Sequence, residues 1–321
     1  MMNILITSAG SRVSLVKIFQ KELKNIWPES KVMTTDYNTN LSAACNISDK
    51  AFKLPLISHK DYFNSLLNVC KANNIKLIIP TIDTELLLLA NKKEVLLSHG
   101  ITAVISSEKF VNACRNKRSI HRFFEQKDIQ IAKEYSKTNY ELPVFIKPIH
   151  GSRSIDTYTI TKQEDFIDYH FKNDDLMFLK YLDHNYYKEY TCDLYYDKNS
   201  NLKCVVPRKR IEVRNGEVSK GVTEKGVLVS YIKEKLGYID GAIGCLTAQF
   251  FKHLETDEIF GIEINARFGG GFPLTYFSGA NYPKWLIQEY LLNETPLDNF
   301  YEDWEDNLLM LRYDKEVLVH G

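Results

Sequence analysis

The sequence predicts an N-terminal wound α/β domain followed by an α+β region with two lobes. Short apolar runs alternate with segments of helical periodicity over the first hundred residues, and longer strand-like runs dominate after residue 176. A chain of 321 residues, 44% of them hydrophobic, is also large enough to form two or three packed lobes. We expect domains over residues 1–107, 108–175 and 176–321.

The N-terminal domain is predicted from strands that alternate with helices. Asn3–Thr7 is a short apolar run, and apolar positions then recur at helical spacing from about residue 12 to 26. This alternation is typical of a parallel sheet covered by helices. Further strands are expected at 31–35, 50–54, 75–79 and 101–105, and further helices at 59–72 and 83–97.

The pattern changes from about residue 108. Asn215-Gly216 is the sequence signature of a two-residue hairpin, which indicates antiparallel pairing in the last third of the chain. The expected helices are 109–114, 117–126, 163–171, 231–238 and 282–292. The expected strands are 144–147, 157–161, 176–182, 189–196, 202–206, 208–214, 245–253 and 258–265.

Composition restricts the possible partners. Lys plus Arg and Asp plus Glu number 41 each, so no dominant basic face for nucleic acid is expected. No apolar run approaches the roughly 18 residues of a membrane span, and the N-terminus is strand-like rather than a signal peptide. None of the six cysteines lies in a C-x-x-C pair, so we expect them to be reduced thiols. We expect a cytoplasmic protein with small-molecule partners, and we keep a homodimer open.

The glycine patterns of common nucleotide-binding folds are absent. The first strand is followed by Ser8-Ala9-Gly10-Ser11-Arg12, with one glycine where a dinucleotide site has G-x-G-x-x-G. No P-loop motif occurs, and the strand that ends in Lys147 is not followed by the H-R-D and D-F-G motifs of protein kinases. The small polar loop 150–154 after this lysine is instead suited to folding over phosphates.

The most informative segment is the strand that ends in a run of glycines. Glu263, Asn265 and Arg267 share one strand face, because side chains alternate with period two. A carboxylate and an amide oxygen suit a hard divalent cation, and an arginine suits a phosphate. The triplet Gly269–Gly271 lets backbone amides approach an anionic group. If the preceding strand pairs antiparallel, Gln249 lies beside Glu263 as a further oxygen ligand.

Two further groups of charged residues are candidates because of their position. The basic triplet 208–210 is either a solvated face or a site that meets a carboxylate or the γ-phosphate, through Arg210 or through Arg208. Other charged residues fall at strand ends or helix starts of the first domain, where open α/β sheets bind ligands, although Asp83 is equally a helix N-cap. These candidates are Arg12, Asp36, Asp83 and Glu85.

Taken in order, the motifs resemble the ATP-grasp superfamily, and within it short relatives of the large subunit of carbamoyl phosphate synthetase. The ordered motifs are Asn116-Lys117-Arg118, Lys147-Pro148, the small-residue loop, Leu179-Lys180-Tyr181-Leu182, Glu189-Tyr190-Thr191, Gln249-Phe250 and Glu-x-Asn-x-Arg. The resemblance covers nearly the whole chain. It implies a pre-ATP-grasp domain, the two-lobed ATP-grasp fold, ATP, and two Mg2+ ions that Mn2+ could replace.

The resemblance also implies a role for each matching residue. Lys117 and Lys147 would bind ATP phosphates beneath a lid formed by Gly151, Ser152, Arg153 and Ser154. The backbone of Leu179, Lys180, Tyr181 and Leu182 would contact adenine, and Glu189 the ribose. Gln249, Glu263 and Asn265 would hold the metal ions. Arg267, Lys147 and Arg210 would stabilise the transferring phosphoryl group, and the substrate would lie against Gly269, Gly270, Gly271, Arg12 and Asp83. Asn116 and Ser154 depart from the family's usual Asp and Gly.

The implied function is ADP-forming ligation of a carboxylate to an amine, or to a thiol, through an acyl phosphate. One alternative is activation of bicarbonate in the manner of carbamoyl phosphate synthetase. Another is an ATP-binding module without catalysis, against which the presence of Glu263, Asn265 and Arg267 argues. The sequence does not name the acid or the amine.

Overall fold

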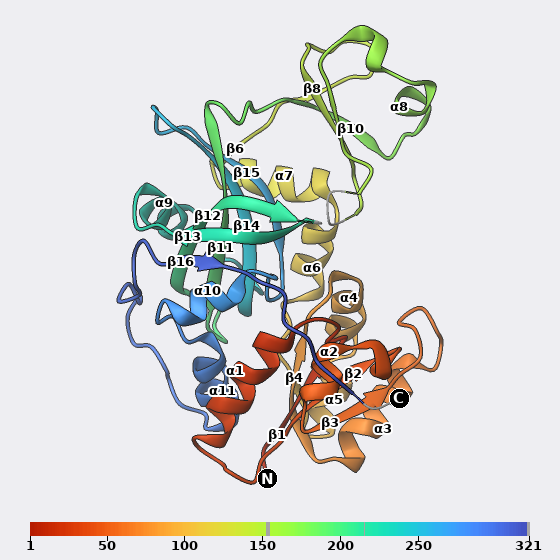
Figure 1. The fold of residues 1–321 in the computed structure, drawn as a ribbon, viewed down its shortest axis with the longest axis vertical. Helices are drawn as coiled ribbons and strands as arrows, with labels where there is room; N and C mark the ends of the chain where they lie inside the picture. Colours follow the sequence, from red (N-terminus) through yellow and green to blue (C-terminus); the bar gives the residue numbers. More distant parts are fainter. Residues whose placement is uncertain (152–154, 215, 320–321) are drawn as a thin grey trace.

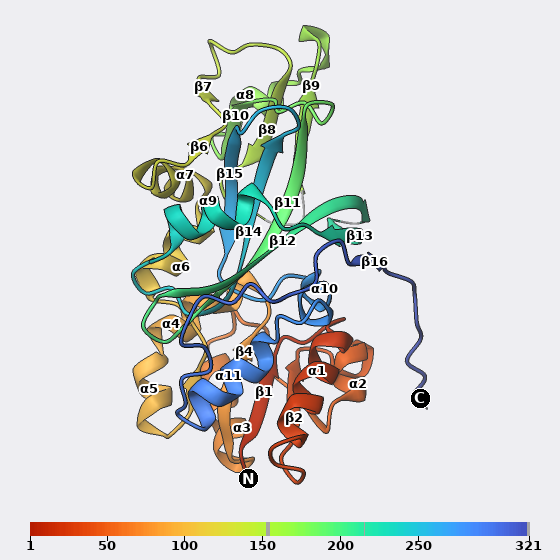
Figure 2. The same ribbon diagram turned by 90° about the vertical axis from the view of Figure 1, so that its left-hand side faces the viewer.

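The computed structural model describes residues 1–151, 155–214 and 216–319, and these residues form three β-sheets. Figure 1 shows the sheets arranged along the long axis, with the N-terminal domain at the bottom, a large sheet in the middle and a small lobe at the top. Figure 2, turned by 90°, shows the same order. The two-part α/β and α+β architecture expected from the sequence is confirmed.

The N-terminal domain contains a five-stranded parallel sheet in the order β3-β2-β1-β4-β5. The expected helix 83–97 is two helices, because the chain leaves helical geometry at Lys92, whose φ is −105° and ψ is 8°. The strands are β1 (Asn3–Thr7), β2 (Val32–Asp36), β3 (Lys50–Lys53), β4 (Ile75–Pro80) and β5 (Thr102–Ala103). The helices are α1 (Val13–Lys24), α2 (Ala43–Ile47), α3 (Tyr62–Ala72), α4 (Asp83–Asn91) and α5 (Lys93–Ser98), with a 3-10 turn at Thr39–Leu41.

The small lobe is an antiparallel sheet in the order β7-β10-β8-β9, with its own apolar cluster around Phe178. Its strands are β7 (Glu134–Tyr135), β8 (Val144–Pro148), β9 (Tyr158–Ile160) and β10 (Leu176–Lys180), and the expected helix 163–171 is a 3-10 turn, Gln163–Asp165, followed by α8 (Asp168–Lys172). Because β10 pairs with β8 from Leu176 to Lys180, we propose that the small lobe extends to residue 180 rather than 175.

The large sheet has the order β16-β13-β12-β11-β14-β15-β6, and its pairs are antiparallel except β15 with β6. Two strands expected at 202–206 and 208–214 are one strand, because Pro207 fits extended backbone and lies opposite Cys192. The strands are β6 (Gln130–Ile131), β11 (Tyr187–Tyr196), β12 (Leu202–Arg214), β13 (Glu217–Thr223), β14 (Gly244–His253), β15 (Ile259–Asn265) and β16 (Leu309–Leu311).

Helices cover both faces of the large sheet. α6 (Glu108–Arg115) and α7 (Lys117–Gln126) contact β15, and α9 (Val227–Leu236) contacts β12. α10 (Phe272–Phe277) contacts β13, and α11 (Tyr282–Leu291) contacts β14, α1 and β4. α10 was not predicted, although Pro273 in its first turn is a typical helix-start residue.

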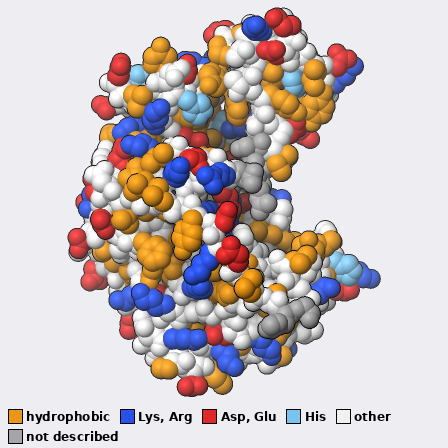
Figure 3. Space-filling model, viewed as in Figure 1, with side chains coloured by type: hydrophobic (Ala, Val, Ile, Leu, Met, Phe, Trp, Pro, Cys, Tyr) orange, Lys and Arg blue, Asp and Glu red, His pale blue; other side chains and the backbone are white. Residues whose placement is uncertain are grey.

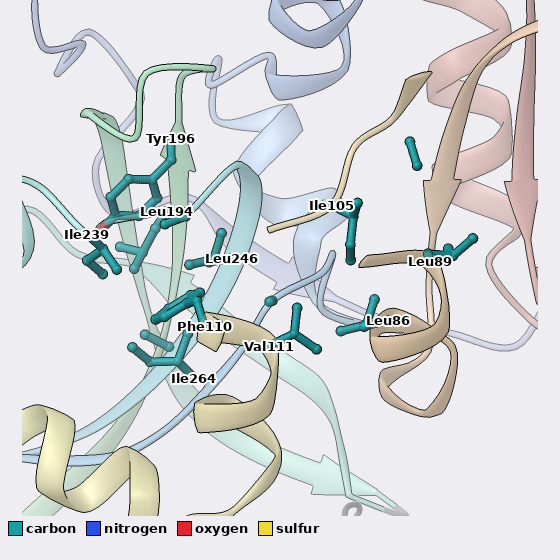
Figure 4. Close-up of a cluster of buried hydrophobic side chains, with 14 of the residues drawn as sticks. Leu86, Leu89, Ile105, Phe110, Val111, Leu194, Tyr196, Ile239, Leu246 and Ile264 are labelled. Carbon is teal, nitrogen blue, oxygen red and sulfur yellow. The ribbon is translucent and has the colours of Figure 1, made fainter. Parts of the chain in front are cut away.

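One apolar cluster joins the N-terminal domain to the large sheet. Figure 4 shows it running from Leu86 and Leu89 through Phe110 and Val111 to Ile264. The small lobe has separate clusters, so its packing is largely its own. Any site between the first domain and the large sheet therefore has continuous core support on that side. Among the helices of the described ranges, none is long and apolar enough to span a membrane.

Candidate functional site

Two adjoining cavities lie where the three sheets meet. The first, of about 390 Å³, lies between the small lobe and the large sheet, and the second, of about 380 Å³, lies between the large sheet and the N-terminal domain. Figure 3 shows the surface hollowed between the small lobe above and the N-terminal domain below. Arg210, Gln249 and Glu263 line both cavities, so ligands in the two cavities would meet at these side chains.

One part of the first cavity is apolar. Its lining includes Phe145, Leu179, Leu182, Phe251 and Ile262, which suits a flat aromatic group. The predicted hinge, 179–182, passes along this wall. The Lys180 backbone N–H donates to the carbonyl of Lys133 at 2.8 Å and is therefore not free to bind a ligand. Backbone hydrogen bonds from this segment to a ligand would come from the residues that follow Lys180.

Another part of the first cavity is cationic and contains both predicted lysines. Lys117 begins α7, and its Nζ donates to the carbonyl of Gly151 at 3.0 Å. Lys147 is 6% exposed on β8, and burial lowers its pKa to about 8 despite the favourable field of Glu263. Lys117 lies close enough to lower the pKa of Lys147 further, and two neighbouring ammonium groups suit a polyanion such as a phosphate chain.

The buried Lys147 predicts a pH dependence of nucleotide binding. Its pKa is lowered, so the free protein loses this ammonium charge as the pH rises through about 8. Above that pH, the dissociation constant for Mg-ATP should rise by about tenfold per pH unit, because only the protonated fraction binds phosphate well. Calorimetric titration on both sides of pH 8 measures this. Lys147→Arg should abolish the dependence, and an equal rise in this variant would contradict the assignment.

Glu189 and Arg210 form an ion pair across β11 and β12. The guanidinium Nη1 of Arg210 donates to the Glu189 carboxylate, and both side chains line the first cavity. Burial raises the pKa of Glu189, and Arg210 opposes that shift. The Arg210 Nε is buried without a hydrogen-bond partner among the described residues, so this guanidinium is incompletely satisfied.

The expected pairing of Gln249 with Glu263 is confirmed. They are register partners on antiparallel β14 and β15, and Thr247 pairs with Asn265. The Asn265 amide donates to Glu263 Oε1 at 2.9 Å, which leaves its own carbonyl oxygen as an acceptor. One carboxylate and two amides are a hard oxygen donor set, which suits a divalent cation that also takes oxygens from a phosphate. No cluster of three or more His, Cys, Asp and Glu suitable for a metal occurs in the described ranges.

The second cavity holds the other predicted residues. Arg267 forms an ion pair with Asp83 at 2.8 Å, so it faces the N-terminal domain and does not line the first cavity. Gly269, Gly270 and Gly271 also line this cavity, as does Arg12 at the start of α1. The cavity therefore combines guanidinium groups with a glycine-rich backbone, which suits an anionic ligand.

A buried ion pair between Arg208 and Asp193 packs against the glycine run. Arg208 is 1% exposed and pairs with the fully buried Asp193 at 3.0 Å, so the solvated-face interpretation of the basic triplet is wrong for this residue. A Cβ at Gly271 would lie 2.1 Å from Arg208 Nη1. The guanidinium thus packs directly against the glycine backbone, which explains why glycine is needed there.

Some sequence expectations are not met by the site. Glu85 is fully buried and hydrogen-bonded to Thr7, Ser8 and Tyr62, which makes it a core group rather than a ligand contact. Asp36 accepts from the Gly10 backbone and lines neither cavity. Ser152, Arg153 and Ser154 of the predicted lid lie outside the described residues.

His121 was missed although it lines the first cavity. It follows Lys117 by four residues, a spacing that places both on one face of α7. Burial, followed by the nearby Lys147, lowers its pKa to about 3, so the ring is neutral at ordinary pH. The sequence signal that could have identified His121 is its position four residues after Lys117, which was predicted to bind phosphate.

A nucleotide-sized cavity between two lobes, beside a wound N-terminal domain, defines the ATP-grasp class of fold. Residues 4–105 match the family model "PylC-like, N-terminal domain", and residues 172–304 match "ATP-grasp in the biosynthetic pathway with Ter operon". Residues 172–304 therefore match an ATP-grasp family, and residues 4–105 match a PylC-like N-terminal domain. These matches are compatible with the narrower resemblance to carbamoyl phosphate synthetase. A search of curated proteins finds no match.

Solved structures share the fold at low identity. The biotin carboxylase domain of Hydrogenobacter thermophilus 2-oxoglutarate carboxylase, with MgADP, ADP and bicarbonate, matches with a TM-score of 0.72 and 16% identity over 96% of this chain and 73% of that chain. Bacillus licheniformis L-amino acid ligase matches with a TM-score of 0.67 and 15% identity over 91% and 74%. Rhizobium etli pyruvate carboxylase matches with a TM-score of 0.72 and 14% identity over 96% of this chain, which spans only 30% of that protein.

Proposed function

We propose that the protein is an ADP-forming ligase that activates a carboxylate as an acyl phosphate and transfers the acyl group to an amine. The observation that carries the proposal is the shared wall of the two cavities, whose polar side chains are Arg210, Gln249 and Glu263. A nucleotide in the first cavity and an acid in the second would meet at this wall. The structurally similar proteins include an L-amino acid ligase and a carboxylase domain bound to MgADP.

In the proposed complex, adenine occupies the apolar part of the first cavity. Because the Lys180 N–H is already used, its backbone contacts come from Tyr181 and Leu182. Glu189 accepts from the ribose, and Lys117 and Lys147 hold the phosphates. Gln249, Glu263 and Asn265 would hold Mg2+, which would neutralise charge on the phosphate oxygens.

The reaction then runs across the shared wall. An oxygen of the substrate carboxylate attacks the γ-phosphorus, the bond to ADP breaks, and an acyl phosphate forms. Arg210 faces both cavities and stabilises the transferring group, while Arg267, held by Asp83, binds on the acid side. The amine displaces phosphate from the acyl carbon and loses a proton, and the Gly269–Gly271 amides stabilise the oxyanion.

The test is ADP release from ATP, screened over pools of amino acids, other carboxylic acids, sugar acids and bicarbonate, with pooled amines. We expect release that depends on both one pool and Mg2+. Release with bicarbonate alone would favour bicarbonate activation instead. Tight Mg-ATP binding without release in any pool would favour a non-catalytic module. A cytoplasmic location is part of the proposal, and the six cysteines, all unpaired, agree with it.

A further inference from the structure

The second cavity is lined by a guanidinium group, Arg12, that has no paired carboxylate in the described ranges, whereas the other three arginines of the lining each form an ion pair. Arg12 lies in the field of two other guanidinium groups, Arg267 and Arg312, and of two carboxylates, Asp83 and Glu217. Each carboxylate already has a partner, since Asp83 pairs with Arg267 at 2.8 Å and Glu217 pairs with Arg312 at 3.1 Å. Among the residues that the structure describes, Arg12 forms no ion pair. Glu263 is the other unpaired charged group of the described lining and is the carboxylate proposed above to hold Mg2+, so it would not compensate Arg12 in the loaded protein.

The surroundings of Arg12 strengthen the effect of this unpaired charge. Arg12 is the N-cap residue of α1, whose first turn contains no acidic residue, so the partial positive charge of the helix end adds to that of the side chain. The residue is half-buried, and desolvation and Arg267 both lower its pKa. A partly desolvated cation without a counter-ion is unfavourable, and binding of an anion removes that cost.

The backbone leaves space in front of this guanidinium. A Cβ at Gly270 would lie 3.0 Å from Arg12 Nη1 and 2.8 Å from a Glu217 carboxylate oxygen. Any larger side chain would fill the gap between α1 and the glycine run. The glycine therefore keeps the cation open to the cavity, where a ligand oxygen can approach it.

The position of Arg12 identifies which anion it would bind. Arg12 lines the second cavity but not the first, whereas a reacting carboxylate would lie at the shared wall beside Glu263 and Arg210. We propose that a substrate of this protein carries a second anionic group, a carboxylate or a phosphate that does not react, and that Arg12 binds it. This inference rests on the proposed ligase function and makes Arg12 a specificity-determining residue. The group belongs either to the acid that is activated or to the amine that accepts it.

A binding experiment tests the charge dependence directly. The probes are succinate, glutarate and inorganic phosphate, and the matched probes succinamate and glutaramate lack the second charge. Tm is measured with each probe at constant ionic strength and saturating Mg-ADP, for the wild type, Arg12→Gln, Arg12→Lys and the exposed control Arg122→Gln. In the wild type and in the control variant, at least one doubly charged probe should raise Tm more than its reference does. The reference is the matched amide for succinate and glutarate, and chloride for phosphate. This difference should disappear in Arg12→Gln and persist in part in Arg12→Lys.

Kinetics with the substrate found in the ADP-release screen completes the test. Arg12→Gln should raise KM at least about tenfold for whichever substrate carries the extra anion, with a smaller effect on kcat, and the affected KM identifies the donor or the acceptor. No charge-dependent shift with any probe, or an unchanged KM, would overturn the inference while leaving the ligase proposal intact. Arg12-dependent binding without ADP release in any pool would instead overturn the ligase proposal and keep the anion site.

Discussion

Glu263→Ala should lower Mg2+-dependent ADP release by roughly 10³-fold or more. Glu263 is the one carboxylate, among the residues the structure describes, that lines both cavities. Its removal leaves the neutral amides of Gln249 and Asn265 as the remaining oxygen donors, and these hold a divalent cation poorly. The measurement is turnover over a range of Mg2+ concentrations, with the acid and amine pools that support release in the wild type.

The fold should tolerate this substitution. The carboxylate is half-buried at the cavity wall and accepts one side-chain hydrogen bond, from Asn265. The thermal midpoint should therefore stay close to that of the wild type. Glu263→Gln keeps the shape of the side chain without its charge, so its turnover should lie between those of the wild type and Glu263→Ala. Glu255→Ala, in the exposed turn between β14 and β15, is the control, and turnover in Glu263→Ala equal to this control would refute the metal site.

Most of the fold could be predicted because its local signals agree with its tertiary contacts. β1 and α7 were placed with the bounds that the structure shows, since a fully buried strand and a strongly amphipathic helix carry clear periodicities. The failures fall where tertiary packing decides the local structure. A proline in an otherwise apolar run predicts an interruption, but pairing with β11 before, at and after Pro207 keeps β12 continuous.

The candidate site was predictable only where its residues share one strand or adjacent strands. Strand alternation places Glu263 and Asn265 on one face, and antiparallel pairing then places Gln249 beside them. The Arg267–Asp83 pair joins residues 184 positions apart, and no local pattern encodes such a contact. Asp193 was also missed, because its partners come from three other elements, the neighbouring strands β12 and β14 and the distant helix α10.

Asp193→Ala should destabilise the protein by about 3–5 kcal/mol, the cost of leaving one member of a buried ion pair without its partner. Asp193 is 0% exposed on β11. Its carboxylate accepts from Arg208 at 3.0 Å, from Thr247 at 3.2 Å and from Thr275 at 2.5 Å, and it thereby joins β11 to β12, β14 and α10. Without it, the guanidinium remains buried behind the glycine run with no counter-charge. Urea unfolding followed by tryptophan fluorescence measures the loss.

Two further variants separate the charge effect from simple loss of packing. Arg208→Met combined with Asp193→Ala removes both charges and should be more stable than Asp193→Ala alone, since the penalty comes from the unpaired cation. As a control, Asp168→Ala removes an exposed ion pair, in which the Asp168 side chain is 86% exposed and the Lys172 side chain 76% exposed. This variant should leave the free energy of unfolding nearly unchanged. If the double variant were instead the less stable, packing against Gly271 would outweigh charge, and Arg208 would support the glycine run by its volume.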